Sequence, residues 1–121
     1  AYEIANKFDI SNYSALMVIG GDGTISEAIN GMMARKDKKK IPIGLIPNGY
    51  SNDICHSLGI KNLDQALDYF LKRETIAIDT VRVLIDVDGE KSLPSGSERM
   101  LQCRYMMAGA QLSMPAKIAS Q

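Results

Sequence analysis

The chain has 121 residues, which is enough for one domain or for a piece of a larger one. Hydrophobic residues make up 45% of it and charged residues 23%, as in an ordinary globular protein, and no apolar run reaches the length of a transmembrane helix. Lys and Arg together number 14, the same as Asp and Glu, so the net charge gives no indication of nucleic-acid or membrane binding.

The first elements alternate between helix and strand. Residues 2–8 predict the last turns of a helix, since Ile4 and Phe8 lie four positions apart. Ala15–Ile19 is a run of five apolar residues, typical of a strand buried on both faces. Further on, apolar side chains recur at helical spacing and predict a helix from about Thr24 to Ala34. Its apolar stripe comprises Ile25, Ala28, Ile29, Met32 and Met33.

A glycine-rich turn, residues 20–24, connects this strand to this helix. Its glycines let the backbone take positive φ and let a ligand approach closely. Thr24 and Glu27 fit a capping box, which predicts that the helix begins at Thr24. The free N–H groups of a first helical turn favour phosphate, and the Asp22 carboxylate could hold Mg²⁺ or accept a proton. The alternative is a tight connection in which Asp22 only bonds nearby N–H groups; the turn is neither a Walker loop nor a dinucleotide-binding turn.

Residues 35–40 carry five positive charges and one negative charge. One interpretation is a solvated loop in which Arg35 and Lys36 suit the negative end of the preceding helix. The other is a patch for anionic lipid headgroups. The sequence favours the first interpretation and leaves the second open.

A second buried strand is predicted over Ile41–Pro47, which makes a β-α-β unit with parallel strands. The loop after this strand, residues 48–53, should therefore face the same cleft as the glycine turn. It leads into a short helix over Ile54–Leu58 that Gly59 ends, with Ser51 or Asn52 as the N-cap. The start of this helix is predicted to be a second phosphate-binding turn next to the first, and the alternative is that Asn52 and Asp53 only cap the helix.

The spacing of apolar residues changes near Ile76, from a helical period to a period of two. Before that point Asn62 caps a helix with Gln65 at its third position, and the apolar stripe of this helix is expected to be core. After it the period becomes two, which predicts antiparallel strands, with a hairpin turn at Asp88-Gly89, a loop over 92–97 and a strand near 101–107. The apolar stripe of the helix that Asn62 caps comprises Leu63, Ala66, Leu67, Phe70 and Leu71.

Cys55 and Cys103 are too few for a disulfide framework, and together with His56 they are not spaced as zinc ligands. Both are expected to be buried thiols in a reducing compartment.

Two linked motifs now identify a resemblance. Asp22-Gly23-Thr24, followed by Ile46-Pro47-x-Gly49-x-x-Asn52-Asp53, resembles the diacylglycerol kinase catalytic domain, a family of lipid kinases that includes acylglycerol and sphingosine kinases. The resemblance implies an α/β fold with a parallel, Rossmann-like β-α-β nucleotide domain that leads into the antiparallel segment of a second, lipid-binding domain. The expected domains are residues 1–75 and 76–121. The first strand of the nucleotide domain would precede Ala1, and most of the β-sandwich would follow Gln121.

The same resemblance implies transfer of the γ-phosphate of ATP to the hydroxyl of a diacylglycerol or acylglycerol, with Mg²⁺ as cofactor. Asp22 would be the metal contact or the catalytic base, and Asp79 would open the segment leading to the lipid-binding domain. The partners would be a lipid and a membrane surface, with possible protein partners and no nucleic acid, at an intracellular site in the cytoplasm or mitochondrion. The nucleotide-binding residues would be Gly20, Gly21, Gly23, Thr24, Glu27, Gly49, Ser51, Asn52 and Asp53.

The chain departs from the family pattern at three places. Tyr50 replaces a small Thr, Ser51 replaces a glycine, and in Gly109–Met114 the position of the family's acid is Ser113. These departures motivate an alternative, a catalytically degenerate domain that serves as a structural or interaction subunit. NAD kinase, which shares the glycine turn, is a less favoured third interpretation.

Overall fold

A computed structural model describes residues 1–86 and 101–107. Two small sheets carry the fold, a parallel pair followed by an antiparallel pair, so the expected mixed α/β architecture is confirmed. No helix in this part of the chain is both long enough and apolar enough to cross a bilayer. In chain order the elements are α1 (Tyr2–Lys7), β1 (Leu16–Gly20), α2 (Asp22–Met33), β2 (Ile43–Pro47), α3 (Asp53–Ser57), α4 (Leu63–Lys72), β3 (Val81–Asp86) and β4 (Leu101–Met106).

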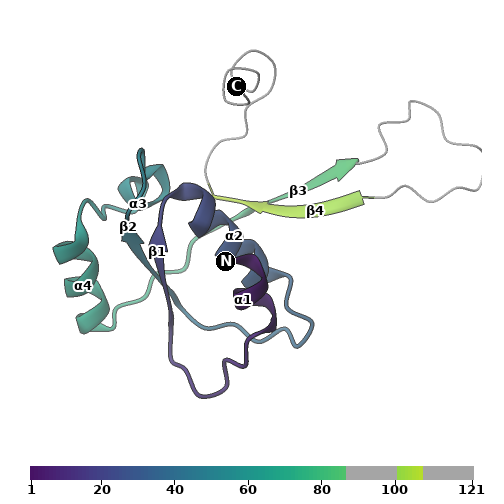
Figure 1. The fold of residues 1–121 in the computed structure, drawn as a ribbon, viewed down its shortest axis with the longest axis horizontal. Coiled ribbons are helices and arrows are strands. Elements are labelled where there is room, and N and C mark those ends of the chain that lie inside the picture. Colours follow the sequence, from purple (N-terminus) through teal and green to yellow (C-terminus); the bar gives the residue numbers. More distant parts are fainter. Residues whose placement is uncertain (87–100, 108–121) are drawn as a thin grey trace, which may run out of the picture.

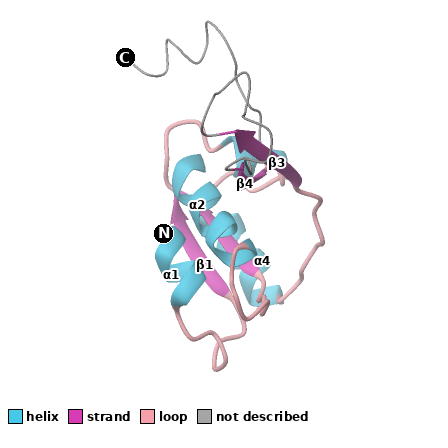
Figure 2. Ribbon diagram, turned by 90° about the vertical axis from the view of Figure 1, so that its right-hand side faces the viewer, coloured by secondary structure: helices cyan, strands magenta, loops and turns pink. Residues whose placement is uncertain are grey.

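The parallel sheet forms the middle layer of the first half. β1 and β2 pair with Leu16 opposite Ile43 and Gly20 opposite Pro47, and α2 is the crossover between them. Helices α1 and α2 lie on one side of this sheet and α4 lies on the other (Figures 1 and 2). Because the strands are parallel, their carboxyl ends meet at one edge, where the glycine turn and the loop after β2 both begin.

The core lies between the sheet and α2. Val18 and Leu45 from the sheet pack with Ile25 of α2, which is completely buried. The prediction that the first strand is buried on both faces is wrong at Ile19, which is 62% exposed, whereas its neighbour on β2, Ile46, is buried. The reason is that α4 packs on β2 and leaves that face of β1 uncovered.

Helix α2 begins two residues earlier than the capping box predicts. Gly21 is the N-cap and no side chain caps it, so the predicted start at Thr24 is wrong. The Glu27 carboxylate, which should have reached back to the helix start, lies 3.1 Å from the backbone nitrogen of Ala1. The side chain that would have closed the capping box is therefore drawn toward α1 instead.

The ends of α3 and α4 follow the local signals in the sequence. Gly59 adopts φ +77° after α3, and the N–H of Ile60 donates to the carbonyl of Cys55. The helix therefore ends at a glycine C-cap, as predicted. Asn62 caps α4 by accepting the Gln65 N–H at 2.9 Å, as predicted.

The apolar stripe of α4 is not core, contrary to the prediction. Ala66 is its one buried member, because α4 covers a single strand and its stripe is wider than that contact. The exposed members are Leu63 (50%), Leu67 (41%), Phe70 (43%) and Leu71 (77%).

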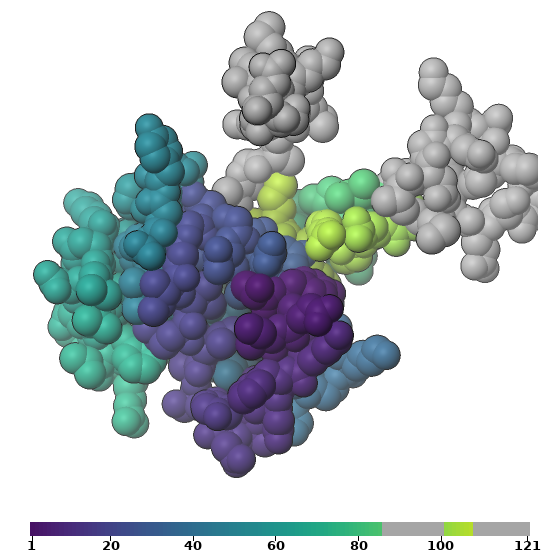
Figure 3. Space-filling view, in the orientation of Figure 1, coloured from purple at the N-terminus to yellow at the C-terminus, as the bar shows by residue number. Residues whose placement is uncertain are grey.

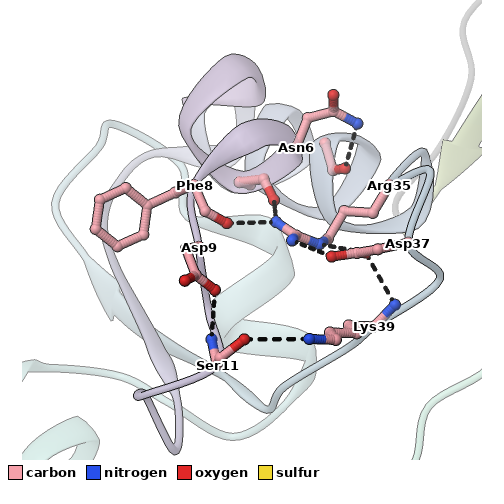
Figure 4. A network of polar contacts seen from close by, with 9 residues as sticks. Asn6, Phe8, Asp9, Ser11, Arg35, Asp37 and Lys39 are labelled. Carbon is pink, nitrogen blue, oxygen red and sulfur yellow. Dashed lines mark hydrogen bonds and ion pairs between the residues drawn. The ribbon is translucent and has the colours of Figure 1, made fainter.

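Arg35, expected in a solvated loop, is buried. Its guanidinium donates to the carbonyls of Ala5 (3.0 Å) and Phe8 (2.8 Å), two acceptors at the end of α1, and it forms a two-bond ion pair with Asp37. This arginine therefore fastens α1 to the loop after α2 (Figure 4). The charge run is a structural anchor followed by four exposed lysines.

Antiparallel pairing in the second part is confirmed, with Val81 opposite Met106. A buried polar side chain, Asn30 of α2, bonds β4 to the first half, and Met107 after β4 packs against the core. The Asn30 amide donates to the Tyr105 carbonyl at 2.8 Å, and its oxygen accepts the Tyr105 N–H at 2.8 Å. Asn30 thus pairs with β4 in the way that a neighbouring strand would.

The two cysteines differ in environment. Cys55 is fully buried as predicted, and burial raises the pKa of its thiol, to which the nearby Asp22 charge adds. Cys103 is exposed on β4, so the prediction for it is wrong. The expected turn at 88–89, the loop at 92–97 and the segment Gly109–Met114 lie outside the described residues.

Asn30→Ala should lower the free energy of unfolding by about 1–3 kcal/mol, because it leaves the N–H and carbonyl of Tyr105 without partners. Denaturant titration measures this loss. Asn12→Ala, in an exposed loop, is the matched control and should change stability by under about 0.5 kcal/mol. Equal stability of the two variants would contradict the role given to Asn30.

Candidate functional site

The two loops that follow the parallel strands are in direct contact. The Asn48 N–H donates to the Gly20 carbonyl at 3.0 Å, which extends the strand pairing by one step. A Cβ on Gly21 would lie 3.1 Å from the Cα of Gly49, and one on Gly49 would overlap the Cα of Gly21. Only residues without side chains permit this approach, so the glycines at both positions are required by contact between two backbones.

Asp22 connects the glycine turn to the start of α3. Its Oδ1 accepts the Ile54 N–H at 2.8 Å, and its Oδ2 accepts the Asp53 N–H at 3.0 Å and the Ser51 hydroxyl at 3.1 Å. These are the bonds that an N-cap side chain normally makes, supplied here from another part of the chain. Asp22 therefore caps α3 across the cleft edge and fixes the position of the second loop.

These contacts set the acidity of Asp22. The Ile54 N–H has the largest effect and lowers the pKa of this carboxyl; burial opposes it, and the bonds from the Asp53 N–H and the Ser51 hydroxyl keep the pKa below its ordinary value.

Asn52 is the N-cap of α3, one of the two candidates that the sequence offered, but its side chain does not cap the helix. It adopts φ +52°, and its amide group turns back to Gly49, accepting the Gly49 N–H at 2.8 Å and donating to the Gly49 carbonyl at 3.0 Å. These two hydrogen bonds join Gly49 to Asn52, both of which belong to the second motif, and so close the loop.

The start of α2 has backbone donors for which the described residues provide no hydrogen-bond acceptor. The N–H groups of Gly23 and Thr24 lie in the first helical turn and have no intrahelical acceptor. A Cβ on Gly23 would have no atom within 4 Å, so the space above this turn is open. Gly20 is different, because a Cβ there would lie 2.8 Å from the Thr24 side chain. The turn at Gly23 and Thr24 therefore has the donors and the access that an anionic group needs.

The start of α3 does not offer the second phosphate site that its sequence suggests. Its first two N–H groups are already bonded to Asp22. Tyr50, one of the departures from the family pattern, is fully exposed. The second loop therefore supports the first turn more than it adds donors to it.

Most of the predicted site residues do come together. Glu27 does not join the two loops, since its carboxylate lies beside Ala1, and Asp79 lies in the segment between α4 and β3. Among the described residues no group of three His, Cys, Asp or Glu could hold a metal ion on its own. The residues gathered at the two loops are Gly20, Gly21, Asp22, Gly23, Thr24, Gly49, Ser51, Asn52 and Asp53.

The capping of α3 by Asp22 was not predicted in detail. Local capping patterns join residues three positions apart, whereas Asp22 and Ile54 are 32 apart in sequence. The available signal was the parallel β-α-β unit, which brings the two loops to one edge.

A family model of the diacylglycerol kinase catalytic domain matches residues 1–83. The chain belongs to this family. The matching segment includes both loops and the whole two-stranded parallel sheet. Lipid-kinase ancestry is therefore established for the first half and the start of the second.

Acylglycerol kinase of Xenopus laevis, named as mitochondrial, is 34% identical over 101 residues, covering 76% of this chain and 22% of that protein. The human mitochondrial acylglycerol kinase is 32% identical, covering 70% of this chain and 21% of its own. Sphingosine kinase 1 of Arabidopsis thaliana is 39% identical over 61 residues, covering 48% of this chain and 13% of that kinase. The chain thus spans about a fifth of the acylglycerol kinases, and no solved structure matches it.

Gly49→Ala should destabilise the protein by about 1–3 kcal/mol, because the added methyl group overlaps the backbone of Gly21. Gly23→Ala is the matched control: its methyl group meets open space, and stability should stay the same or rise by up to about 1 kcal/mol. Thermal unfolding of both variants is the measurement. A harmless Gly49→Ala would show that the loops do not touch.

The contribution of Asp22 to stability should depend on pH. Since its folded pKa is lowered, the stabilisation is complete above the ordinary value near about 4 and is lost as the pH falls through the folded value. Asp22→Asn should lower stability at neutral pH and remove this part of the acid dependence. Denaturant titrations at several pH values compare it with Asp64→Asn, an exposed carboxylate on α4; identical acid dependence in both variants would contradict the capping role.

Proposed function

We propose that this chain is the nucleotide-binding part of an ATP-dependent lipid kinase, which transfers the γ-phosphate to a hydroxyl of an acylglycerol or diacylglycerol. The observation that carries the proposal is the open first turn of α2, locked in place by the second loop of the family motif. The names of the two acylglycerol kinases support a glycerolipid substrate. Their description as mitochondrial supports an intracellular location, either mitochondrial or cytoplasmic.

The residues present fit the phosphates of ATP. The unpaired N–H groups of Gly23 and Thr24 and the positive end of the α2 dipole would bind the phosphate oxygens, and Gly23 leaves the access open. Mg²⁺ supplies charge neutralisation at the transferred phosphoryl group when MgATP is bound. It usually needs only one or two carboxylates besides the phosphates, which matches a site where Asp22 is the carboxylate.

Asp22 acts in this proposal as a positioning residue and a metal contact. Oδ1 accepts one hydrogen bond and so keeps a free lone pair, while Oδ2 uses both of its lone pairs. Asp53, which follows the second loop, is the other carboxylate at this edge. Phosphoryl transfer needs mainly positioning and charge neutralisation, which two rigid loops provide.

A specific observation favours the second candidate function, a lipid-kinase-like domain without catalysis. In this chain Ser51, where the family has glycine, donates to Asp22, and the first two N–H groups of α3 are used in structural bonds. Such a domain would serve as a structural or interaction subunit. NAD kinase has no comparable support, since the relatives reported above are lipid kinases.

The experiment measures MgATP binding by calorimetry and phosphoryl transfer to monoacylglycerol, diacylglycerol, sphingosine and NAD, using the intact protein. Binding with transfer to a glycerolipid supports the first candidate. Binding without transfer to any acceptor, or no binding at all, supports the second. Transfer to NAD in preference to lipids would restore the third.

Gly23→Ala provides the sharpest variant. Its methyl group should obstruct the approach of phosphate to the α2 amides and weaken MgATP binding about tenfold or more, although the fold is not destabilised. Ser14→Ala, at the other end of β1, is the control and should bind normally. Unchanged MgATP affinity in Gly23→Ala would mean that the nucleotide does not use this turn.

A further inference from the structure

Two loops at the amino ends of the parallel strands form a surface that the nucleotide proposal does not use. One loop joins α1 to β1 and the other joins α2 to β2, and both lie at the end of the sheet away from α3 (Figures 1 and 3). We call their exposed side chains the basic-aromatic surface. It comprises Phe8, Tyr13, Lys36, Lys38, Lys39 and Lys40, all of them exposed.

The fold buries the one arginine of this region in an ion pair and leaves the four lysines exposed. Arg35 is buried, where it uses both Asp37 carboxylate oxygens in its ion pair. Asp9, the other carboxylate of these loops, accepts the backbone N–H of Ser11 at 3.0 Å. Asp37 is thus paired with the buried arginine, and the four exposed lysines of its loop outnumber the one remaining carboxylate, Asp9.

The two loops are joined to each other. Lys39 donates from Nζ to the Ser11 hydroxyl at 3.1 Å and from its backbone to Asp37 at 3.0 Å, as Figure 4 shows. Tyr13 and Lys40 line one shallow depression of about 370 Å³ between the loops. The lysines are consequently placed beside the aromatic residues.

The aromatic residues are unusually exposed for their type. Phe8 is 52% and Tyr13 is 55% exposed, and their rings pack on each other at 5.6 Å with a tilt of 54°. The Phe8 ring projects away from the polar network in Figure 4. The pair forms a small apolar tip next to the lysines.

We propose that the basic-aromatic surface docks this protein reversibly on an anionic lipid bilayer, with the lysines at the headgroups and the aromatic pair at the interface. Clustered lysines near such a surface gain attraction roughly in proportion to their number, and aromatic side chains prefer the headgroup region. The inference goes beyond the proposed kinase activity and does not depend on it.

The composition of the surface favours a bilayer over a nucleic acid or an acidic protein. Arginine is the residue suited to two-bond recognition of phosphate, and in these loops the arginine is buried while the exposed cations are lysines. Lysines act as point charges that suit a diffuse anionic surface. The two rings pack on each other, which leaves less ring face for stacking on bases.

The geometry keeps docking and nucleotide binding apart. Each parallel strand has five residues, so the two ends of the sheet lie roughly 17 Å apart. A bilayer at the amino ends would leave the glycine turn uncovered, so the lipid acceptor of the proposed reaction would have to reach it from outside the bilayer.

The test is sedimentation of the intact protein with phosphatidylcholine vesicles, with and without about one third phosphatidylserine. We expect binding to the anionic vesicles, decreasing as salt rises, and little binding to the neutral ones. The double variant Lys36→Gln/Lys40→Gln should bind anionic vesicles about thirtyfold more weakly, at roughly fivefold per lysine. Circular dichroism checks that it remains folded.

The control is Lys61→Gln/Lys72→Gln, which changes the net charge equally at the two ends of α4, since Lys61 lies just before the helix and Lys72 is its last residue. It should keep vesicle affinity within about twofold, because its lysines lie outside the proposed surface. Equal losses in both double variants, absence of vesicle binding, or tighter binding of RNA or polyglutamate than of vesicles would each overturn the proposal. MgATP affinity is measured in parallel and should be the same in wild type and variants; if the wild type binds vesicles but not MgATP, the kinase proposal fails and the docking surface stands.

Discussion

The contact between Gly21 and Gly49, closed by the Asp22 carboxylate, is the constraint on which the first half of the structure depends. Parallel pairing delivers two loops to the same edge, but it does not by itself hold them together. The two glycines allow the backbones to approach, and the hydrogen bonds between Asp22 and the start of α3 stabilise this contact. The open turn at the start of α2 is therefore supported by the second loop, and such support reduces the ordering cost of binding a ligand.

Helix α2 extends this arrangement through the molecule. Its first turn carries the candidate phosphate donors, its middle packs Ile25 on the sheet, and its later turn holds β4 through Asn30. Beyond its end, Arg35 fixes α1. A single helix thus relates the glycine turn, the antiparallel hairpin and the opposite end of the sheet to one another.

Periodicity and turn chemistry predicted the elements, and the paired motifs predicted which loops would meet. What could not be predicted depends on contacts between distant segments. Thr24 and Glu27 match a capping box, yet the helix begins at Asp22. Asp22 bonds the distant Ile54 N–H, and Glu27 lies beside Ala1 instead of reaching back to the helix start. The stripe of α4 has core composition, but whether it is buried is decided by how many strands it covers. Arg35 resembles its neighbouring lysines in sequence and differs from them only because two carbonyls of α1 come within reach of it.

The contrasting environments of the two cysteines have a practical consequence. Cys55 is sealed in the core, whereas Cys103 stands exposed on β4, two residues before the strand position that Asn30 holds. A thiol-reactive fluorophore would therefore attach selectively at Cys103. Its emission would report on the attachment of β3 and β4 to the first half of the chain without the need to engineer a labelling position.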